Sequence, residues 1–323
     1  MTVINYRKAI AEGIARAMRE DSTVVFLGED VAVAGGAFKT TVGLRDEFGP
    51  ERVFDTPISE QAIIGAAIGA AMRGLRPIAE IMFSDFLGTC WDGIANHAAK
   101  IRYMTDGAYS VPMVIRTHGG AGLGFGAQHS QLYDGLAMSI PGLKVVVPST
   151  PGDLIGLFQS AVRDPDPVLF IEHKALFDLK EELPPDGHAV PLGQACVRRQ
   201  GSDVTLVATG AMVNVAVAAA DLLQPTGVSC EVIDLRTLTP LDMDTVLTSL
   251  AKTSRLVLVE EGPGICGWSS EVAARVADEG FWMLDAPVRR VCSPPTPTPF
   301  AESLEKLWLP TPEAVAAEIE SYS

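Results

Sequence analysis

The segment VFDTPISEQAIIGAAIGAAM, residues 53–72, joins a short apolar strand through a polar turn to a helix made mostly of alanine, glycine and isoleucine. Elsewhere in the chain, apolar runs of strand length alternate in the same way with longer stretches of helical period. This alternation is typical of a mainly parallel sheet covered by helices on both faces. We predict an α/β protein with two doubly wound domains, because 323 residues exceed one domain of roughly 100 to 200 residues.

Local signals place the individual strands and helices. They are clearest at Thr150, Pro151 and Asp153, which supply an N-cap, a first-turn proline and a first-turn acid for a helix ending at Arg163. The other predicted elements are strands at 24–27, 53–54, 77–81, 113–116, 145–147, 168–171, 204–208, 229–233 and 256–259, and helices at 6–19, 213–223 and 241–250.

The domain boundary is predicted between Leu183 and Gly193, where several prolines occur without any periodicity. We place it so that one domain covers residues 1–187 and the other covers residues 188–323. A proline-rich turn at 294–299 precedes a C-terminal helix.

The charge balance narrows the classes of partner. With 40 acidic and 25 basic residues the net charge is −15, which repels phosphate backbones and anionic lipid, so we expect no nucleic acid. We expect no membrane partner either, since the longest uncharged apolar-rich run, residues 61–72, is shorter than the ~20 residues of a membrane helix. The first 20 residues do not resemble a signal peptide and the five cysteines are scattered, which favours a cytoplasmic protein with reduced thiols.

Glu60 is the first candidate for chemistry. Ser59 is a natural N-cap, which places Glu60 in the first turn of a helix at the carboxyl end of a strand, where open α/β sheets bind ligands. In the helix behind it, Gly65 and Gly69 would let another backbone pack closely, so we expect a core or an interface there. The helix dipole would lower the pKa of Glu60 and burial would raise it. A first-turn glutamate facing water is the alternative.

A glycine-rich loop is the second candidate. Residues 119–126 hold five glycines directly after a strand, and His129 stands at the far end. Such a loop brings backbone N–H groups close to a ligand, and a histidine titrates near neutral pH. The loop matches no nucleotide-phosphate motif. We expect His97 and His173 to be structural and leave the role of His118 open.

The turn Gly262 to Gly267 matches the dinucleotide motif G-x-G-x-x-G between a strand and a helix, with Asp285 at about the expected distance downstream. Two features oppose that interpretation. Glu260 and Glu261 would repel a pyrophosphate, and the proline inside the turn lacks a backbone donor. An NAD-dependent oxidoreductase using this turn is therefore a remote alternative.

Three motifs, taken in order, resemble one family: TPISE at 56–60, AQHSQ at 127–131, and VIDLRTLTPLD at 232–242 with VEEG at 259–262. They are similar to the beta subunit of the thiamin-diphosphate-dependent decarboxylating component of 2-oxo acid dehydrogenase complexes, including pyruvate, branched-chain and acetoin dehydrogenases. The resemblance spans nearly the whole chain. It implies a pyrimidine-binding thiamin-diphosphate fold followed by a transketolase C-terminal domain.

The resemblance also implies roles for single residues. Glu60 would hydrogen-bond a ring nitrogen of the cofactor's aminopyrimidine and promote the tautomer that deprotonates the thiazolium carbon, which is general acid–base work. Ile58 and Phe86 would flank and stack on the pyrimidine. His129 would donate or position a proton when the acyl group passes to lipoamide. The implied reaction is oxidative decarboxylation of pyruvate or a branched-chain 2-oxo acid, with acetoin as the alternative substrate.

Further ligands and partners follow from the same resemblance. A loop that can hold potassium largely through backbone oxygens is matched by Ala161, Val162, Asp164 and Asp166. Asp285 matches a residue that contacts the lipoyl acyltransferase core. The chain has no Gly-Asp-Gly motif for the metal that holds the cofactor's phosphates, so Mg²⁺ is expected on an alpha subunit in an alpha2beta2 heterotetramer. A scaffold that only docks partners is the non-catalytic alternative.

Overall fold

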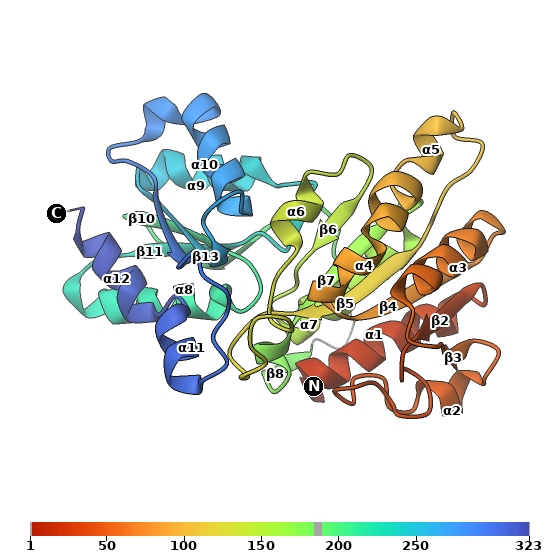
Figure 1. Ribbon diagram of the computed structural model, residues 1–323. Helices are drawn as coiled ribbons and strands as arrows, with labels where there is room; N and C mark the ends of the chain where they lie inside the picture. The colour runs from red at the N-terminus through yellow and green to blue at the C-terminus, as the bar shows by residue number, and fades with distance from the viewer. Residues whose placement is uncertain (1, 184–188, 323) are drawn as a thin grey trace.

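Two α/β lobes stand side by side in the computed structural model, which describes residues 2–183 and 189–322 (Figure 1). The first lobe is built on a seven-stranded sheet of order β12-β6-β7-β5-β4-β2-β3. All neighbouring pairs are parallel except β12 with β6. The strands are β2 (Val24–Gly28), β3 (Val53–Asp55), β4 (Arg76–Phe83), β5 (Val114–Gly119), β6 (Lys144–Val146), β7 (Val168–His173) and β12 (Thr237–Thr239).

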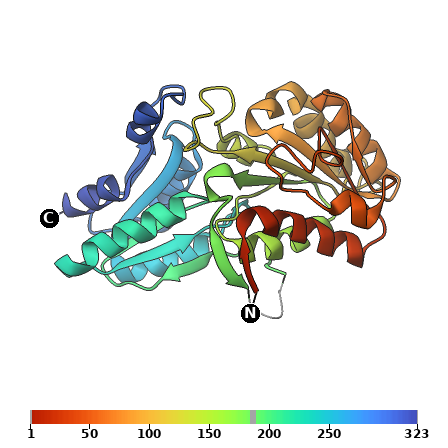
Figure 2. The same ribbon diagram turned by 90° about the horizontal axis from the view of Figure 1, so that it is seen from below.

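Helices cover both faces of this sheet. On one face α1 (Tyr6–Glu20) packs against α7 (Pro151–Arg163), as the view from below shows (Figure 2). On the other lie α3 (Glu60–Met72), α4 (Leu87–Asp92) and α6 (Asp134–Met138). The smaller elements of the lobe are α2 (Leu44–Phe48), α5 (Ile101–Met104) and an antiparallel pair, β1 (Thr2–Asn5) with β8 (Lys180–Leu183).

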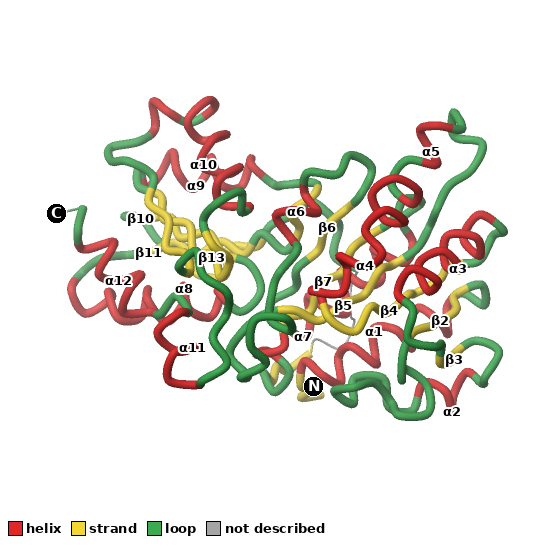
Figure 3. Tube along the Cα trace, viewed as in Figure 1, coloured by secondary structure: helices red, strands yellow, loops and turns green. Residues whose placement is uncertain are grey.

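The second lobe repeats this layering on a five-stranded sheet of order β14-β13-β10-β11-β9 (Figure 3). Its strands are β9 (Cys196–Arg199), β10 (Val204–Ala208), β11 (Cys230–Asp234), β13 (Leu256–Pro263) and β14 (Arg289–Ser293). Its helices are α8 (Met212–Leu223), α9 (Met243–Thr253), α10 (Trp268–Glu279), α11 (Glu302–Trp308) and α12 (Pro312–Glu320). The predicted class, α/β with two mainly parallel sheets covered by helices, is confirmed, with β9 antiparallel to β11 at the edge of the second sheet. No helix among the described residues is both long enough and apolar enough to cross a membrane.

The two lobes share one apolar core. A single cluster of buried side chains runs from Ile64 on α3 to Val272 on α10, so the same core covers one face of each sheet. The strand β12 crosses over as well, since it follows β11 in the chain but pairs with β6 of the first lobe. The sequence pattern did not predict this crossover. The domain boundary predicted at residue 187 falls outside the described residues.

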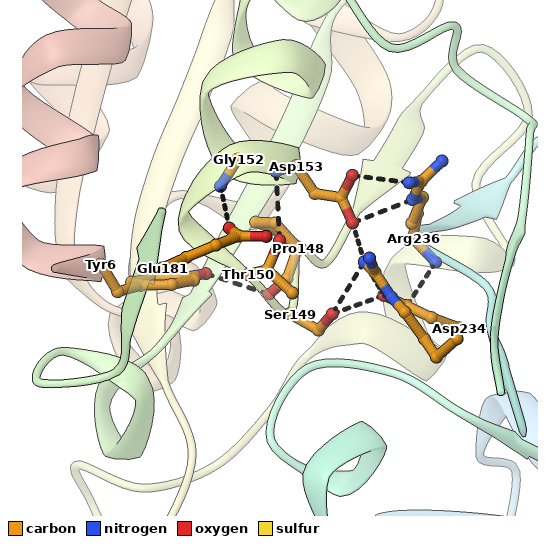
Figure 4. Close-up of polar contacts among 10 residues, drawn as sticks. Tyr6, Pro148, Ser149, Thr150, Gly152, Asp153, Glu181, Asp234 and Arg236 are labelled. Carbon is orange, nitrogen blue, oxygen red and sulfur yellow. Dashed lines mark hydrogen bonds and ion pairs between the residues drawn. The ribbon is translucent and has the colours of Figure 1, made fainter. Parts of the chain in front are cut away.

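Ion pairs between charged side chains connect the two lobes (Figure 4). Asp153, in the first turn of α7, pairs with Arg236 at 2.6 Å and also with Arg198. Arg198 in turn reaches Asp234 at the end of β11, at 2.7 Å, and Asp234 accepts a hydrogen bond from Ser149. Both aspartates are buried, so these ion pairs act in a low-dielectric setting and fix the start of α7 against the second lobe.

The strongest local prediction is confirmed at α7. The Thr150 side chain accepts a hydrogen bond from the Asp153 amide, and the helix runs over the predicted residues. At α3 the predicted N-cap position is confirmed, and the helix packs differently from a core helix at its glycines. Ser59 occupies the N-cap position, but its side chain makes no capping hydrogen bond. Gly65 and Gly69 face open space rather than a close-packed backbone of this chain.

Candidate active site

The candidate residues meet at one edge of the first sheet. Because β2, β3, β4, β5 and β7 are parallel, their carboxyl ends lie together, and this is where open α/β sheets place ligand sites. The turns that follow these strands carry Glu29, Glu60, Phe86, the glycine-rich loop 119–131 and Lys174. Five separate segments therefore contribute to one region.

Glu60 is half-buried at the start of α3, beside Ile58, whose side chain is 75% exposed. Burial raises the pKa of Glu29 above its usual value, and the charges of Asp30 and Glu60 add to that shift. Burial also raises the pKa of Cys90 to about 12, with the charge of Glu60 as the second cause. Carboxylates are therefore concentrated here, next to an open apolar surface.

Phe86 and His129 contact each other. Their ring centroids lie 5.3 Å apart in an edge-to-face arrangement, and Phe83 contacts His129 in the same way at 4.7 Å. Phe83 also contacts Phe86 at 5.4 Å, so the three rings form one group. Among the described residues no hydrogen bond or ring contact joins this group directly to Glu60. The structure therefore brings Phe86 and His129 together and places Glu60, with Ile58, on the turn after β3, which is separated from β4 by β2 in the sheet.

Carboxylates of the second lobe hold the glycine-rich loop. Glu261 accepts a hydrogen bond from the Ala121 amide at 2.7 Å, and its other oxygen lies 2.6 Å from His173. Glu305 on α11 accepts from the amides of Gly122 and Gly124 at 2.9 and 3.0 Å. These acidic side chains are buried. They occupy the loop amides that sequence analysis had offered to a ligand.

The far end of the loop is tied to the first lobe. Asp85 accepts hydrogen bonds from the backbone and side chain of Gln131, at 3.3 and 2.9 Å. Lys174 donates to the carbonyl oxygen of His129. A cavity of about 640 Å³ borders the loop and is lined in part by Ser130, Glu261 and Trp308. Hydrogen bonds as well as packing therefore determine the position of the loop.

A buried arginine network lies on the strands that carry these turns. Arg116 on β5 is fully buried and pairs with Glu172 at 2.6 Å and with Glu80. Its guanidinium also lies 2.8 Å from Nε2 of His118. Because arginine can only donate, that nitrogen accepts, and Nδ1 of His118 donates to the Met82 carbonyl oxygen at 2.8 Å. Burial and the Arg116 charge hold the pKa of His118 well below its usual value, so His118 is a neutral structural residue.

The dinucleotide-like turn has the predicted strand–turn–helix shape but no room for a phosphate. Glu260 places its carboxylate at the start of α10, where it accepts from the amides of Trp268 and Ser269 at 3.1 and 3.2 Å. A Cβ atom added to Gly267 would lie 2.2 Å from the same carboxylate. The helix N-terminus, which binds the pyrophosphate in dinucleotide folds, is therefore filled by an acidic side chain of the chain itself.

The predicted potassium loop is surrounded by basic side chains. Arg76 donates to the Val162 carbonyl at 2.7 Å, and Lys144 pairs with Asp164 at 2.5 Å and with Asp166 at 3.3 Å. A bound ion would therefore depend on backbone oxygens, because both carboxylates already have cationic partners. No cluster of three or more His, Cys, Asp or Glu side chains suited to a metal is found in residues 2–183 and 189–322.

Sequence analysis missed four residues that shape the site: Lys174, Glu261, Glu305 and Arg116. Glu261 stands in the family motif VEEG and was interpreted as a charge that would repel phosphate, not as an anchor of the loop. The other three lie in stretches without any motif, and their partners are between 36 and 183 positions away. Their importance follows from the three-dimensional arrangement alone.

The chain is similar to known proteins in sequence and in fold. The family model described as "Transketolase, pyrimidine binding domain" matches residues 2–180, and "Transketolase, C-terminal domain" matches residues 193–315. The beta subunit of an acetoin:2,6-dichlorophenolindophenol oxidoreductase from Bacillus subtilis is 48% identical, covering 98% of this chain and 96% of its own. From the same organism, 2-oxoisovalerate dehydrogenase subunit beta is 44% identical (98% of both chains) and pyruvate dehydrogenase E1 component subunit beta is 42% identical (96% and 94%).

A solved structure described as "Split gene transketolase, inactive beta4 tetramer" matches with a TM-score of 0.82 at 25% identity, covering 98% of this chain and 97% of its own. Fold, site and family models together define a transketolase-like α/β protein. Within that class, the chain belongs to the family of beta subunits of acetoin, branched-chain 2-oxo acid and pyruvate dehydrogenases. The resemblance inferred from the three sequence motifs is confirmed.

Proposed function

We propose that this chain activates thiamin diphosphate as the beta subunit of a dehydrogenase that oxidises a short 2-oxo acid, or alternatively acetoin, and passes the acyl group to a lipoyl group. One observation carries the proposal: the Glu60 carboxylate lies at the carboxyl edge of the first sheet, next to Glu29 and beside the exposed side chain of Ile58. Family membership supports the cofactor, because transketolase-like dehydrogenases depend on it.

The residues at this edge fit the aminopyrimidine half of the cofactor. The carboxylates of Glu29, Asp30 and Glu60 favour a ring nitrogen that takes up a proton. Ile58 and the half-buried ring of Phe86 offer apolar surface to the faces of a flat heterocycle. When bound, thiamin diphosphate supplies the carbon nucleophile for the substrate carbonyl and the ring that takes up the electron pair.

In this proposal the chain's own residues move and hold protons. Glu60 holds a proton at the pyrimidine ring nitrogen, which is general acid–base catalysis by a positioned carboxylate. His129 holds a proton where the acyl group leaves for the lipoyl sulfur. Its ring nitrogens have no hydrogen-bond partner among the described residues, while Phe83 and Phe86 fix the ring plane, which supports this role.

A partner subunit completes the enzyme. The chain has no Gly-Asp-Gly motif, so Mg²⁺ and the diphosphate are assigned to an alpha subunit, in an alpha2beta2 assembly. The outer face of α3 supports this assignment, because Gly65 and Gly69 there face open space and Ile58 precedes the helix as an exposed apolar residue. Asp285, exposed in the second lobe, is assigned to contact with the lipoyl acyltransferase core.

Two smaller assignments belong to the same proposal. Potassium is assigned to the loop of Ala161, Val162, Asp164 and Asp166, largely through backbone oxygens. We place the enzyme in the cytoplasm, which the free thiols of all five cysteines support, because such thiols persist in reducing compartments.

The decisive experiment replaces Glu60 with alanine in the complex reassembled with its cognate alpha subunit. Turnover should fall at least about 100-fold, the usual contribution of a general acid or base, while alpha–beta assembly measured by size-exclusion chromatography is retained. Near wild-type turnover would rule the mechanism out. A panel of pyruvate, branched-chain 2-oxo acids and acetoin, assayed with the wild-type complex, identifies the substrate.

The alternatives have their own tests. An NAD-dependent oxidoreductase requires saturable NADH binding by this chain in a fluorescence titration, and the position of Glu260 at the start of α10 opposes it. A non-catalytic scaffold requires that His129→Ala leave lipoyl acylation unaffected.

A further inference from the structure

Lys174 is a buried lysine without a role in the mechanism above. It directly follows β7 and is 1% exposed. No ion pair to Lys174 is found in the part of the chain that the structure describes, and the only hydrogen bond to its ammonium there is the one to the His129 carbonyl oxygen. The ammonium instead lies over two aromatic rings, 4.8 Å from the centroid of Phe125 and 5.1 Å from that of Phe83.

This arrangement is unfavourable for stability alone. Burial lowers the pKa of Lys174 to about 8, although the charges of Asp85, Glu261 and Glu305 oppose the shift. A buried cation without a close carboxylate pays a desolvation penalty that two ring faces and one carbonyl only partly offset. An apolar side chain of the same length would fill the space between the rings without that penalty. The lysine therefore contributes something other than folding energy.

Its single hydrogen bond shows what that contribution is. The other anchors of the glycine-rich loop hold Ala121, Gly122, Gly124 and Gln131. Among the described residues, Lys174 is the one side chain that hydrogen-bonds His129 itself. Phe83 links the two residues a second time, since its ring contacts both the Lys174 ammonium and the His129 imidazole.

We propose that Lys174 is a positioning residue for His129: by holding the carbonyl of that peptide, it aims the imidazole at the reacting acyl group. The inference rests on the proposed function, because it assigns Lys174 to the same acyl-transfer step. An error of about 1 Å in the position of a catalytic group is enough to slow a reaction substantially.

The test replaces Lys174 with methionine in the reassembled complex and measures two activities on each preparation. One is acylation of a lipoyl domain. The other is reduction of 2,6-dichlorophenolindophenol, an artificial acceptor that requires no acyl transfer to lipoyl. We expect Lys174→Met to lower the ratio of lipoyl acylation to dye reduction at least about tenfold, because a misplaced His129 affects the acyl-transfer step most. Its melting temperature should equal or exceed that of the wild type.

Two further variants make the result specific. In the double variant with His129→Ala, the ratio should match that of His129→Ala alone, because a residue that acts through His129 adds nothing once the imidazole is gone. Lys252→Met is the matched control: it removes another lysine, one paired with the buried Glu231 in the second lobe, so it should lower stability and leave the ratio unchanged.

Three results would overturn the inference. They are an unchanged ratio in Lys174→Met, losses that multiply in the double variant, and a ratio lowered equally by Lys252→Met. Absence of lipoyl acylation in the wild-type complex would instead overturn the proposed function and the inference together, so the two failures are distinguishable.

Discussion

Two glycine-rich segments follow parallel strands in this molecule, and they differ in which part of the chain binds their backbone amides. The loop after β5 is held from outside, by Glu261 and Glu305 of the other lobe, and it carries His129, whose ring nitrogens have no hydrogen-bond partner among the described residues. In the turn at the end of β13, the amides at the start of α10 are bound by Glu260, a residue of the same strand.

The difference teaches that glycine content alone does not identify a ligand site. Glycine allows backbone amides to approach an acceptor closely, and in both segments that acceptor is a glutamate of this chain. The useful question is which group the amides already bind. In the first loop, the answer leaves His129 as the group available for chemistry.

The largest effect is expected from removing the external anchor of the first loop. Glu305→Ala leaves the amides of Gly122 and Gly124 without their acceptor, and two hydrogen bonds to a buried carboxylate are worth about 3–6 kcal/mol of unfolding free energy. Lipoyl acylation should also fall, since the loop that carries His129 loosens. Hydrogen exchange of a peptide covering 119–131, together with chemical denaturation, measures both effects.

Glu302→Ala provides the control on the same helix. Glu302 is exposed and, among the described residues, pairs with Lys306 alone, so its loss should leave both the exchange of the loop and the stability unchanged. If the loop exchanged equally slowly in Glu305→Ala, the two carboxylate hydrogen bonds would not be what orders it.

A smaller effect is expected at the turn at the end of β13, and it depends on pH. Burial, reinforced by the charge of Asp134, raises the pKa of Glu260 from 4.5 to about 7. The folded protein thus binds this proton more tightly than the unfolded chain does, so Glu260 removes stability as the pH rises from about 4.5 to 7. The Glu260→Gln variant lacks this dependence. As the pH rises from 5 to 8, its free energy of unfolding should therefore increase by about 3 kcal/mol relative to that of the wild type.

Urea denaturation at a series of pH values checks the difference between the two proteins. Glu271→Gln, an exposed change in the first turn of the same helix, should leave the pH profile as it is in the wild type. Parallel profiles for Glu260→Gln and the wild type would contradict the assignment of a raised pKa to this carboxylate.

The smallest effect concerns the predicted potassium loop, where both carboxylates are already paired with cations. If potassium binds there through backbone oxygens, exchanging tetramethylammonium for potassium chloride at equal ionic strength should stabilise the protein by about 1 kcal/mol when the ion is a few-fold above its dissociation constant. Thermal denaturation measures this. Identical melting temperatures in the two salts would remove potassium from the proposal.

The parts of the fold that local chemistry controls could be predicted from the sequence. The cap at Thr150, the proline at 151 and the acid at 153 define α7 because each acts within one helical turn. The buried strand Val204–Ala208 was predicted without error for a similar reason, since strands buried on both faces are continuous apolar runs. The family resemblance also implied that Phe86 and His129 belong to one site, and the fold brings these two rings into contact.

What could not be predicted depends on partners that are distant in the sequence. The three residues of β12 look like a loop because their pairing with β6 spans about ninety positions, which no local period reports. Glu305 and Lys174 have no motif, since each binds a backbone group that any residue type could supply. Ser59 lies at the predicted N-cap of α3, but its side chain makes no capping hydrogen bond, because a residue type shows only that a cap is available.

The crossover of β12 has a practical consequence for dissecting this protein. A fragment that ended near Leu183 would lose the strand that shields β6, and would present an open row of backbone donors and acceptors at the edge of the sheet. It would also uncover the side of the shared core that α10 occupies. Such a fragment should aggregate rather than fold alone, so domain-by-domain expression is unsuited to this protein and variants are best studied in the full chain.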